Sequence, residues 1–210
     1  MCGVFGFVAM EPGEPINLRI LSRVARETMR RGPHAWGLAW VDSKDRLHMF
    51  KQSGRIVDAL GLLSMAKDAQ MLIGHCRYAT HGAPDDNRNN HPHVAGDGWI
   101  VHNGVISQYR TIVREHGLTM RTACDSEVLG LLIDQLPGPL KQRCSKAARI
   151  AEGGPLAMLG LWKDRLIAVR QDGQPLHLGE TRRACYLASL PDGLPGDVEL
   201  VDDDRVLEFK

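Results

Sequence analysis

The chain has 210 residues, of which 43% are hydrophobic and 24% charged, and its formal net charge is +1. A chain of this length can bury the core of one globular domain. Its near-neutral charge gives no electrostatic reason to expect binding to nucleic acid or to an anionic membrane. No apolar run is long enough for a transmembrane helix, and the start lacks the features of a signal peptide, so we expect a cytoplasmic protein.

In the first half of the chain, apolar spacing predicts a strand over 4–10, a helix over 16–29, a hairpin over 36–51, a helix over 55–67 and a strand over 71–77. The polar segment 81–98 is longer than most connections, and we interpret it as a functional or disordered loop. In the second half we expect a strand over 99–104, helices over 107–116, 125–135 and 140–151, and then short strands. Strands at both ends with helices between them predict a layered α+β fold.

Cysteine usage draws attention to the start of the chain. The five cysteines are widely spaced and odd in number, and they contain no C-x-x-C pair, which argues against a disulfide framework and a zinc ribbon. Cys2 directly follows the initiator methionine, so removal of Met1 would leave a thiol and a free α-amine on one residue. That residue would be a nucleophile with its own base. A buried structural cysteine is the alternative, and position alone does not decide.

Histidines are concentrated in the middle of the chain. Their spacing matches no familiar metal cage, so we predict no metal site and interpret HPH as a rigid turn. The histidines concerned are His75, His81, His91, His93 and His102.

Three short motifs carry groups that suit a free amino acid as substrate. In HNG, the side-chain amide of Asn103 and the backbone N–H of Gly104 are candidate donors to a developing oxyanion. In GHCRYATHG, Arg77 offers a fork for a carboxylate, and in CDSEV, Asp125 is a candidate acceptor for a cationic amine. Each motif also has an ordinary structural interpretation: a hairpin turn for HNG, a surface ion pair for Arg77 and a helix cap for Asp125.

Together the motifs resemble one family over nearly the whole chain. Six segments occur in the order and rough spacing of class II glutamine amidotransferases, which are N-terminal-nucleophile hydrolases: CGVFGF, RRGPHAWGLAWV, GHCRYATHGAP, NNHPHV, VHNGVI and CDSEV. Within the family, the chain is most similar to the glutaminase domain of glucosamine-6-phosphate synthase. The resemblance implies a four-layer αββα sandwich over residues 1–210, without a synthase or sugar-isomerase domain. It implies no cofactor.

The resemblance also implies residue roles. Cys2 would attack the side-chain amide of L-glutamine with its own α-amine as base, and Asn103 and Gly104 would form the oxyanion hole. The substrate α-carboxylate and α-ammonium would be bound by four residues, and two others would support the nucleophile. The binding residues are Arg77, Thr80, His81 and Asp125, and the supporting pair is Arg31 and Gly32. The products would be glutamate and ammonia, released through a γ-glutamyl thioester.

The sequence departs from the family pattern in three respects. Pro33, His34 and Ala35 replace the common aromatic-aspartate-serine run after the arginine-glycine pair. Tyr78 stands where a tryptophan is usual. The chain stops at Lys210, where the glutaminase domain would end, so we expect a synthase partner supplied in trans to receive the ammonia.

Two other functions remain open at this stage. One is a stand-alone amidohydrolase that cleaves another γ-glutamyl amide, because Arg77 and Asp125 would bind the same glutamyl group. The other is a non-catalytic module that senses glutamine. Against this alternative, every catalytic residue of the matched motifs is present.

Overall fold

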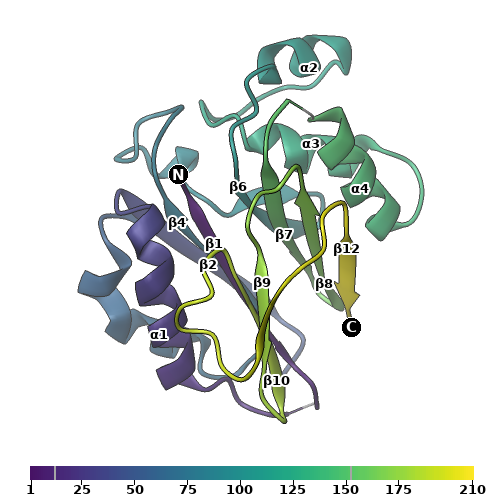
Figure 1. Cartoon of the computed structure of the whole chain (residues 1–210). Coiled ribbons are helices and arrows are strands. Elements are labelled where there is room, and N and C mark those ends of the chain that lie inside the picture. The colour runs from purple at the N-terminus through teal and green to yellow at the C-terminus, as the bar shows by residue number, and fades with distance from the viewer. Residues whose placement is uncertain (12, 152) are drawn as a thin grey trace.

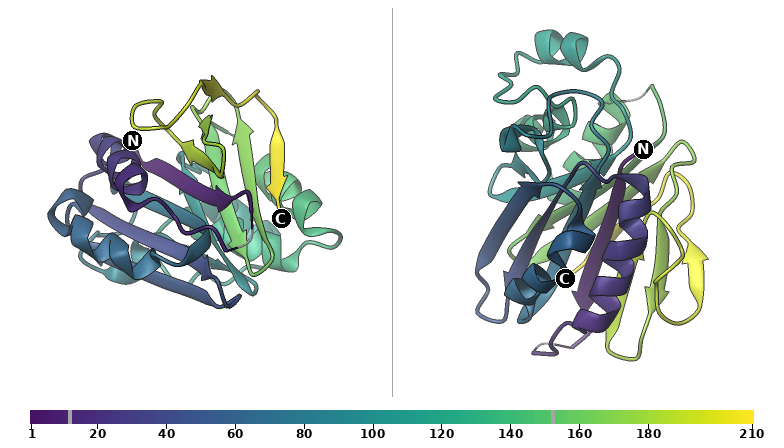
Figure 2. Two further views of the ribbon diagram at one scale, coloured as in Figure 1. Left: turned by 90° about the horizontal axis from the view of Figure 1, so that it is seen from below. Right: turned by 90° about the vertical axis from the view of Figure 1, so that its left-hand side faces the viewer.

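The computed structural model describes residues 1–11, 13–151 and 153–210. Two antiparallel sheets lie face to face, and helices cover the outer face of each (Figures 1 and 2). This is the four-layer αββα arrangement that the resemblance implied. In the described part of the chain, no helix combines the length and apolarity needed to cross a bilayer.

The first sheet has the strand order β11-β9-β10-β1-β4-β2-β3. Its central strands are β1 and β4, and both are buried along nearly their whole length. The strands are β1 (Gly3–Ala9), β2 (Ala35–Asp42), β3 (Leu47–Ser53), β4 (Ala69–Arg77), β9 (His177–Glu180), β10 (Ala184–Ala188) and β11 (Val198–Leu200). In the register of β1 on β4, Gly3 pairs with Cys76, which brings the start of the chain next to the end of β4.

The second sheet has the order β12-β8-β7-β6-β5. Its strands are β5 (His93–Ala95), β6 (Gly98–Asn103), β7 (Leu156–Trp162), β8 (Arg165–Gln171) and β12 (Val206–Phe209). The α-helices are α1 (Leu18–Thr28), α2 (Tyr109–Glu115), α3 (Glu127–Gln135) and α4 (Leu140–Ile150), and the short 3₁₀ elements are Met29–Arg31, Ile56–Ala66 and Asn87–Asn89.

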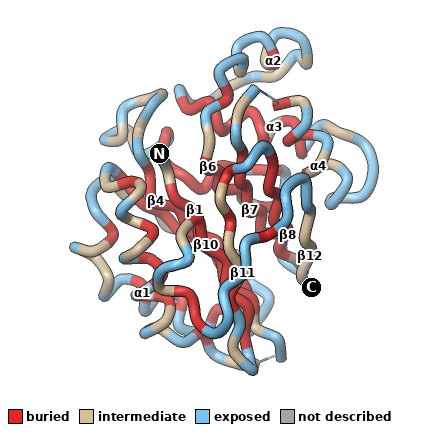
Figure 3. The backbone as a smooth tube through the Cα atoms, in the orientation of Figure 1, coloured by how far each residue is buried: buried red, intermediate tan, exposed pale blue. Residues whose placement is uncertain are grey.

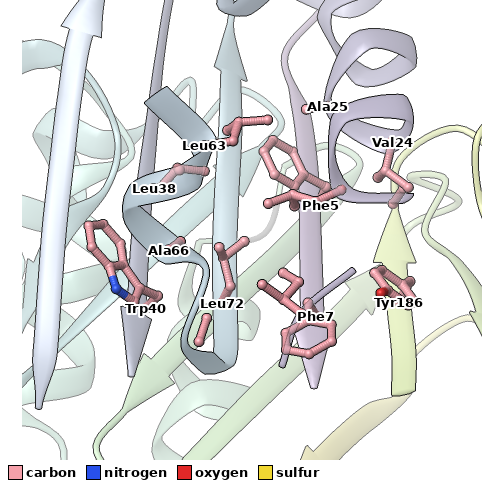
Figure 4. Packing of buried hydrophobic residues seen from close by; sticks show 14 of the residues in the cluster. Phe5, Phe7, Val24, Ala25, Leu38, Trp40, Leu63, Ala66, Leu72 and Tyr186 are labelled. Carbon is pink, nitrogen blue, oxygen red and sulfur yellow. The ribbon is translucent and has the colours of Figure 1, made fainter. Parts of the chain in front are cut away.

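The alternation of β1 shows why the layers form. Phe5 and Phe7 point to one face and pack with α1, where the rings of Phe7 and Tyr186 lie 5.3 Å apart (Figure 4). Val4 and Val8 point to the other face and belong to the core between the two sheets. Because successive side chains of a strand face opposite sides, an apolar run buried on both faces predicts such a central strand. The buried strands form the middle of the molecule, with exposed segments around them (Figure 3).

Two expected elements differ from the structure. The expected helix over 55–67 is a pair of 3₁₀ turns, Ile56–Ala66, broken at Ala59, whose φ of −132° is not helical. Gly61 weakens helix formation here, while Ile56 and Leu63 are buried, so packing on the sheet decides the conformation. The long loop expected over 81–98 also contains a 3₁₀ turn and strand β5.

Candidate active site

The candidate nucleophile, Cys2, lies at the end of the buried strand β1. Its Sγ is 3.4 Å from the carbonyl oxygen of Tyr78, to which it donates, and 3.3 Å from the Tyr78 backbone nitrogen, which donates to it. Burial raises the pKa of the Cys2 thiol, while the Tyr78 hydrogen bond and the positive charges of the chain terminus and Arg77 act in the opposite direction. The thiol is therefore held in place before any substrate arrives.

Cys2 borders a cavity of about 350 Å³. Asn103 and Gly104, at the end of β6, line the same cavity, as does Thr80. The structure therefore brings together residues from positions 2, 80 and 103–104. A cavity with a nucleophile, a side-chain amide and a glycine backbone on its walls has the components of an acyl-transfer site.

Asn103 and Gly104 are tightly constrained. The Asn103 side chain is fully buried, and its Nδ2 donates to the Ser189 hydroxyl at 3.3 Å. Its Oδ1 has no hydrogen-bond partner among the described residues. A Cβ on Gly104 would lie 2.5 Å from the carbonyl oxygen of Pro155, which explains why a glycine is needed here. The hairpin-turn interpretation of HNG does not apply, because β6 is followed by α2 rather than by a paired strand.

Arg77 is buried, and the loop that follows occupies its guanidinium. It donates to Asn90 Oδ1 at 2.8 Å, to the Gly82 carbonyl at 2.9 Å, and to the carbonyl of His81. Arg77 is not a surface ion pair, because only 2% of it is exposed. It does not line the cavity, and its hydrogen bonds join the loop 81–90 to the end of β4.

Asp125 and His81 lie together beside the start of α3. Asp125 Oδ2 accepts the backbone N–H of Ile106 at 2.7 Å, and its Oδ1 is 3.7 Å from His81 Nδ1. The helix begins at Glu127 with Ser126 as its first flanking residue, so Asp125 is not the helix cap that one interpretation of the sequence expected. Asp125 instead joins α3 to the turn that follows Gly104.

The arginine-glycine pair contacts the chain around the nucleophile. Arg31 Nε donates to the carbonyl oxygen of Cys2 at 2.7 Å. A Cβ on Gly32 would lie 2.3 Å from the carbonyl oxygen of Cys76, so only glycine allows this close approach of the two backbones. Both residues therefore support the position of Cys2 without lining the cavity.

His34 and Tyr78, two of the residues at which the sequence departs from the family pattern, are in contact. His34 Nδ1 accepts the backbone N–H of Ala79 at 3.0 Å, and its ring packs on that of Tyr78 with a centroid distance of 4.8 Å. Because Tyr78 also contacts the Cys2 sulfur through its backbone, the substituted pair forms one unit beside the nucleophile.

Two residues that hydrogen-bond to Asn103 are not among the site residues predicted from the sequence. Ser189 is fully buried, and its hydroxyl accepts the backbone N–H of Val4 at 2.9 Å as well as the Asn103 amide. Gln174 borders the cavity and donates through Nε2 to the Asn103 carbonyl at 3.2 Å. Ser189 belongs to no motif. Gln174 lies in RQDGQPLHLG, a segment that also resembles the family, but nothing in that segment assigns it a role, so only the fold reveals both contacts.

Comparison with known proteins was made for the whole chain. No family model matches it. The glutamine–fructose-6-phosphate aminotransferase of Aquifex aeolicus is 33% identical over 222 residues, which cover 100% of this chain and 36% of that protein. The enzyme of the same name from Bacillus licheniformis is 37% identical over 139 residues, covering 64% and 22% of the two chains. The chain thus spans about a third or less of the length of these relatives.

Solved structures share the fold. The glutamine phosphoribosylpyrophosphate amidotransferase of B. subtilis superposes with a TM-score of 0.74 at 24% identity, over 100% of this chain and 49% of the other. A glutamine aminotransferase class-II domain protein from Silicibacter pomeroyi has a TM-score of 0.62 at 17% identity, over 99% and 94%. The chain is a relative of the class II glutamine amidotransferases. The resemblance carried by the six sequence segments and the expected sandwich fold are both confirmed.

Proposed function

We propose that the chain hydrolyses L-glutamine to glutamate and ammonia through a γ-glutamyl thioester on Cys2. The observation that carries this proposal is the shared cavity of Cys2, Asn103 and Gly104 at the end of a buried strand. The similarity to glutamine–fructose-6-phosphate aminotransferases over the whole chain supports the same substrate.

In this mechanism, Met1 is first removed, and Met1 is 73% exposed, which leaves it accessible to a processing enzyme. The α-amine of Cys2 takes the thiol proton, and Sγ attacks the side-chain amide carbon. The Asn103 amide and the Gly104 N–H stabilise the oxyanion, and the proton passes to the leaving nitrogen as ammonia departs. Water then attacks the thioester, with the same amine as base, and glutamate leaves.

In this proposal Arg77 binds the α-carboxylate of the substrate and Asp125 binds its α-ammonium. Thr80 and His81 complete the binding site for this head group. Because both terminal nitrogens of Arg77 already donate to loop acceptors, carboxylate binding requires the guanidinium to exchange the carbonyl of His81 or Gly82 for a substrate oxygen. We therefore assign the loop 81–90 a movement on substrate binding. We propose that the ammonia is passed to a separate synthase and that the reaction takes place in the cytoplasm.

The test combines intact mass with turnover. Protein that lacks Met1 should release ammonia from glutamine, and a γ-electrophilic glutamine analogue should add to Cys2. Cys2→Ala should bind glutamine and release no ammonia, while Cys144→Ala, at a buried cysteine of α4, should keep its turnover. Retention of Met1 in fully active protein, or turnover by Cys2→Ala, would refute the mechanism.

A parallel assay with γ-glutamyl methylamide and γ-glutamyl anilide tests the substrate. If glutamine is inert and a conjugate is cleaved, the chain is a stand-alone amidohydrolase rather than an ammonia donor. Glutamine binding without turnover of any amide would indicate a sensing module. A synthase that co-purifies with the chain and raises its glutaminase rate would support transfer of ammonia in trans.

A further inference from the structure

Three potential metal ligands from two segments that are distant in sequence lie together, outside the lining of the active-site cavity. They are His91 and His93, on either side of Pro92, and Cys124, just before α3. One ligand atom from each lies within 4.8 Å of the others, and all three residues are buried. The Asn89 side chain holds the two segments together, because its Oδ1 accepts the backbone N–H of Ala123 at 2.8 Å.

The imidazoles of this cluster have unused nitrogens. Both ring nitrogens of His91 and the Nε2 of His93 are buried and have no hydrogen-bond partner within 1–11, 13–151 and 153–210. The His91 ring stacks on His75 at 3.8 Å and meets the edge of His93 at 4.5 Å, so packing rather than hydrogen bonding holds it. Buried polar atoms are nearly always satisfied, which indicates that these nitrogens have a partner that is not a protein group.

The chemistry of the three side chains suits a metal. Imidazole nitrogen and thiolate sulfur are the ligands that zinc-type ions prefer. The Cys124 Sγ donates to Asp125 Oδ1 at 3.8 Å, a contact that a bound ion would replace. A bound cation removes the proton of a coordinating thiol outright.

The charges around the cluster are mixed. Lys51 and Arg77 are the cations that act on it, and Asp125 is the anion that acts on Cys124. The Lys51 ammonium faces backbone oxygens, donating to the carbonyls of Asn90 at 2.6 Å and Pro92 at 3.1 Å. A Cys124 thiolate would add a second negative charge to that of Asp125 and so offset part of the charge of a divalent ion.

We propose that His91, His93 and Cys124 form a site for a divalent transition metal that accepts nitrogen and sulfur ligands, Zn²⁺ or Co²⁺. Imidazole and thiolate favour these ions and disfavour Mg²⁺ and Ca²⁺. A tetrahedral ion with bonds of about 2.0–2.3 Å needs ligand atoms about 3.3–3.8 Å apart, so small side-chain rotations complete the site. Water fills the fourth position.

The metal would join the segment 81–98 to the start of α3. Asp125 directly follows Cys124, so the ion would stabilise the loop and the helix start on either side of the head-group residues without entering the cavity. The proposal stands whether or not the chain hydrolyses glutamine. The sequence expectation of no metal site was based on spacing, and Cys124 is too far along the chain for any spacing rule to join it to HPH.

The test uses the metal alone and does not depend on activity. Chelator-stripped protein carrying Cys2→Ala, which removes the thiol at the cavity, is titrated with Co²⁺ under reducing, anaerobic conditions. We expect one equivalent to bind with a thiolate-to-cobalt absorption band in the near ultraviolet, and Zn²⁺ to displace it. Adding Cys124→Ser should abolish the band and weaken binding at least tenfold. Adding Cys144→Ser, at a buried cysteine of α4 that is not part of the cluster, should change neither.

A band of equal strength in the Cys124→Ser protein, or no saturable binding at all, would overturn the proposal. If Cys124→Ser does not fold, X-ray absorption of the zinc-loaded Cys2→Ala protein decides the matter. One sulfur and two imidazole scatterers per zinc support the site, and a shell of oxygen and nitrogen alone refutes it.

Discussion

The hydroxyl of Ser189 accepts the side-chain amide of Asn103 at 3.3 Å, across 86 residues of sequence, and also accepts the backbone N–H of Val4 at 2.9 Å. Val4 is two residues from the nucleophile, and Asn103 ends a strand of the other sheet. One buried oxygen therefore sets the distance between the nucleophile strand and the proposed oxyanion donor.

We expect Ser189→Ala to lower kcat for glutamine about fivefold, with little change in KM. A lost hydrogen bond of about 1 kcal/mol would leave the Asn103 amide free to rotate away from the oxyanion, which forms only in the transition state. Steady-state kinetics measure the split, with Ser22→Ala on the outer side of α1 as control. A rise in KM at constant kcat would assign Ser189 to substrate binding instead.

Gly104→Ala should abolish most glutaminase activity and lower the melting temperature by several degrees. Its Cβ would lie 2.5 Å from the Pro155 carbonyl and 2.6 Å from His102 Nε2, so the turn must shift together with the proposed donor N–H. Gly61→Ala is the matched control, because no described atom lies within 4 Å of a Cβ placed there. Wild-type turnover in Gly104→Ala would exclude the Gly104 backbone from the oxyanion hole.

The His34–Tyr78 pair should behave as one unit. In a double-mutant cycle on kcat/KM, His34→Ala and Tyr78→Ala should show a coupling energy of about 0.5–1.5 kcal/mol, because their rings pack at 4.8 Å beside the cysteine. We expect the second substitution to lower kcat/KM by less than the same substitution does in the wild-type protein. Strict additivity would mean that the two departures from the family pattern act independently.

Stability should fall as the pH drops from about 6.5 to about 4. Burial lowers the pKa of His102 to about 4, so in this window the unfolded chain binds a proton that the folded chain does not. The slope from this residue is about 1.4 kcal/mol per pH unit at most. Urea unfolding at several pH values, with chelator present, measures it.

The matched variants are His102→Gln, which should reduce that slope, and His116→Gln on the outer end of α2, which should not. A slope that is identical in wild type and His102→Gln would show that His102 does not carry the acid sensitivity.

Much of the fold is visible in the order of residues. Alternation and helical spacing are local, so β1, the hairpin of β2 and β3, and helices α1, α3 and α4 follow from them to within a few residues. The candidate nucleophile is equally local, because only the residue after Met1 can join a thiol to an α-amine. The failure at Ile56–Ala66 has the opposite cause, since burial against the sheet overrides a weak helical pattern.

The partners of these residues depend on contacts between segments far apart in the chain. No local rule joins Ser189 to Asn103, His34 to Tyr78, or Cys124 to His91, because each pairing follows from how the strands are ordered and how the two sheets stack. Arg77 illustrates the difference. The residue type predicts a side chain that binds a carboxylate. The folded chain shows a buried guanidinium whose terminal nitrogens donate to the loop 81–90.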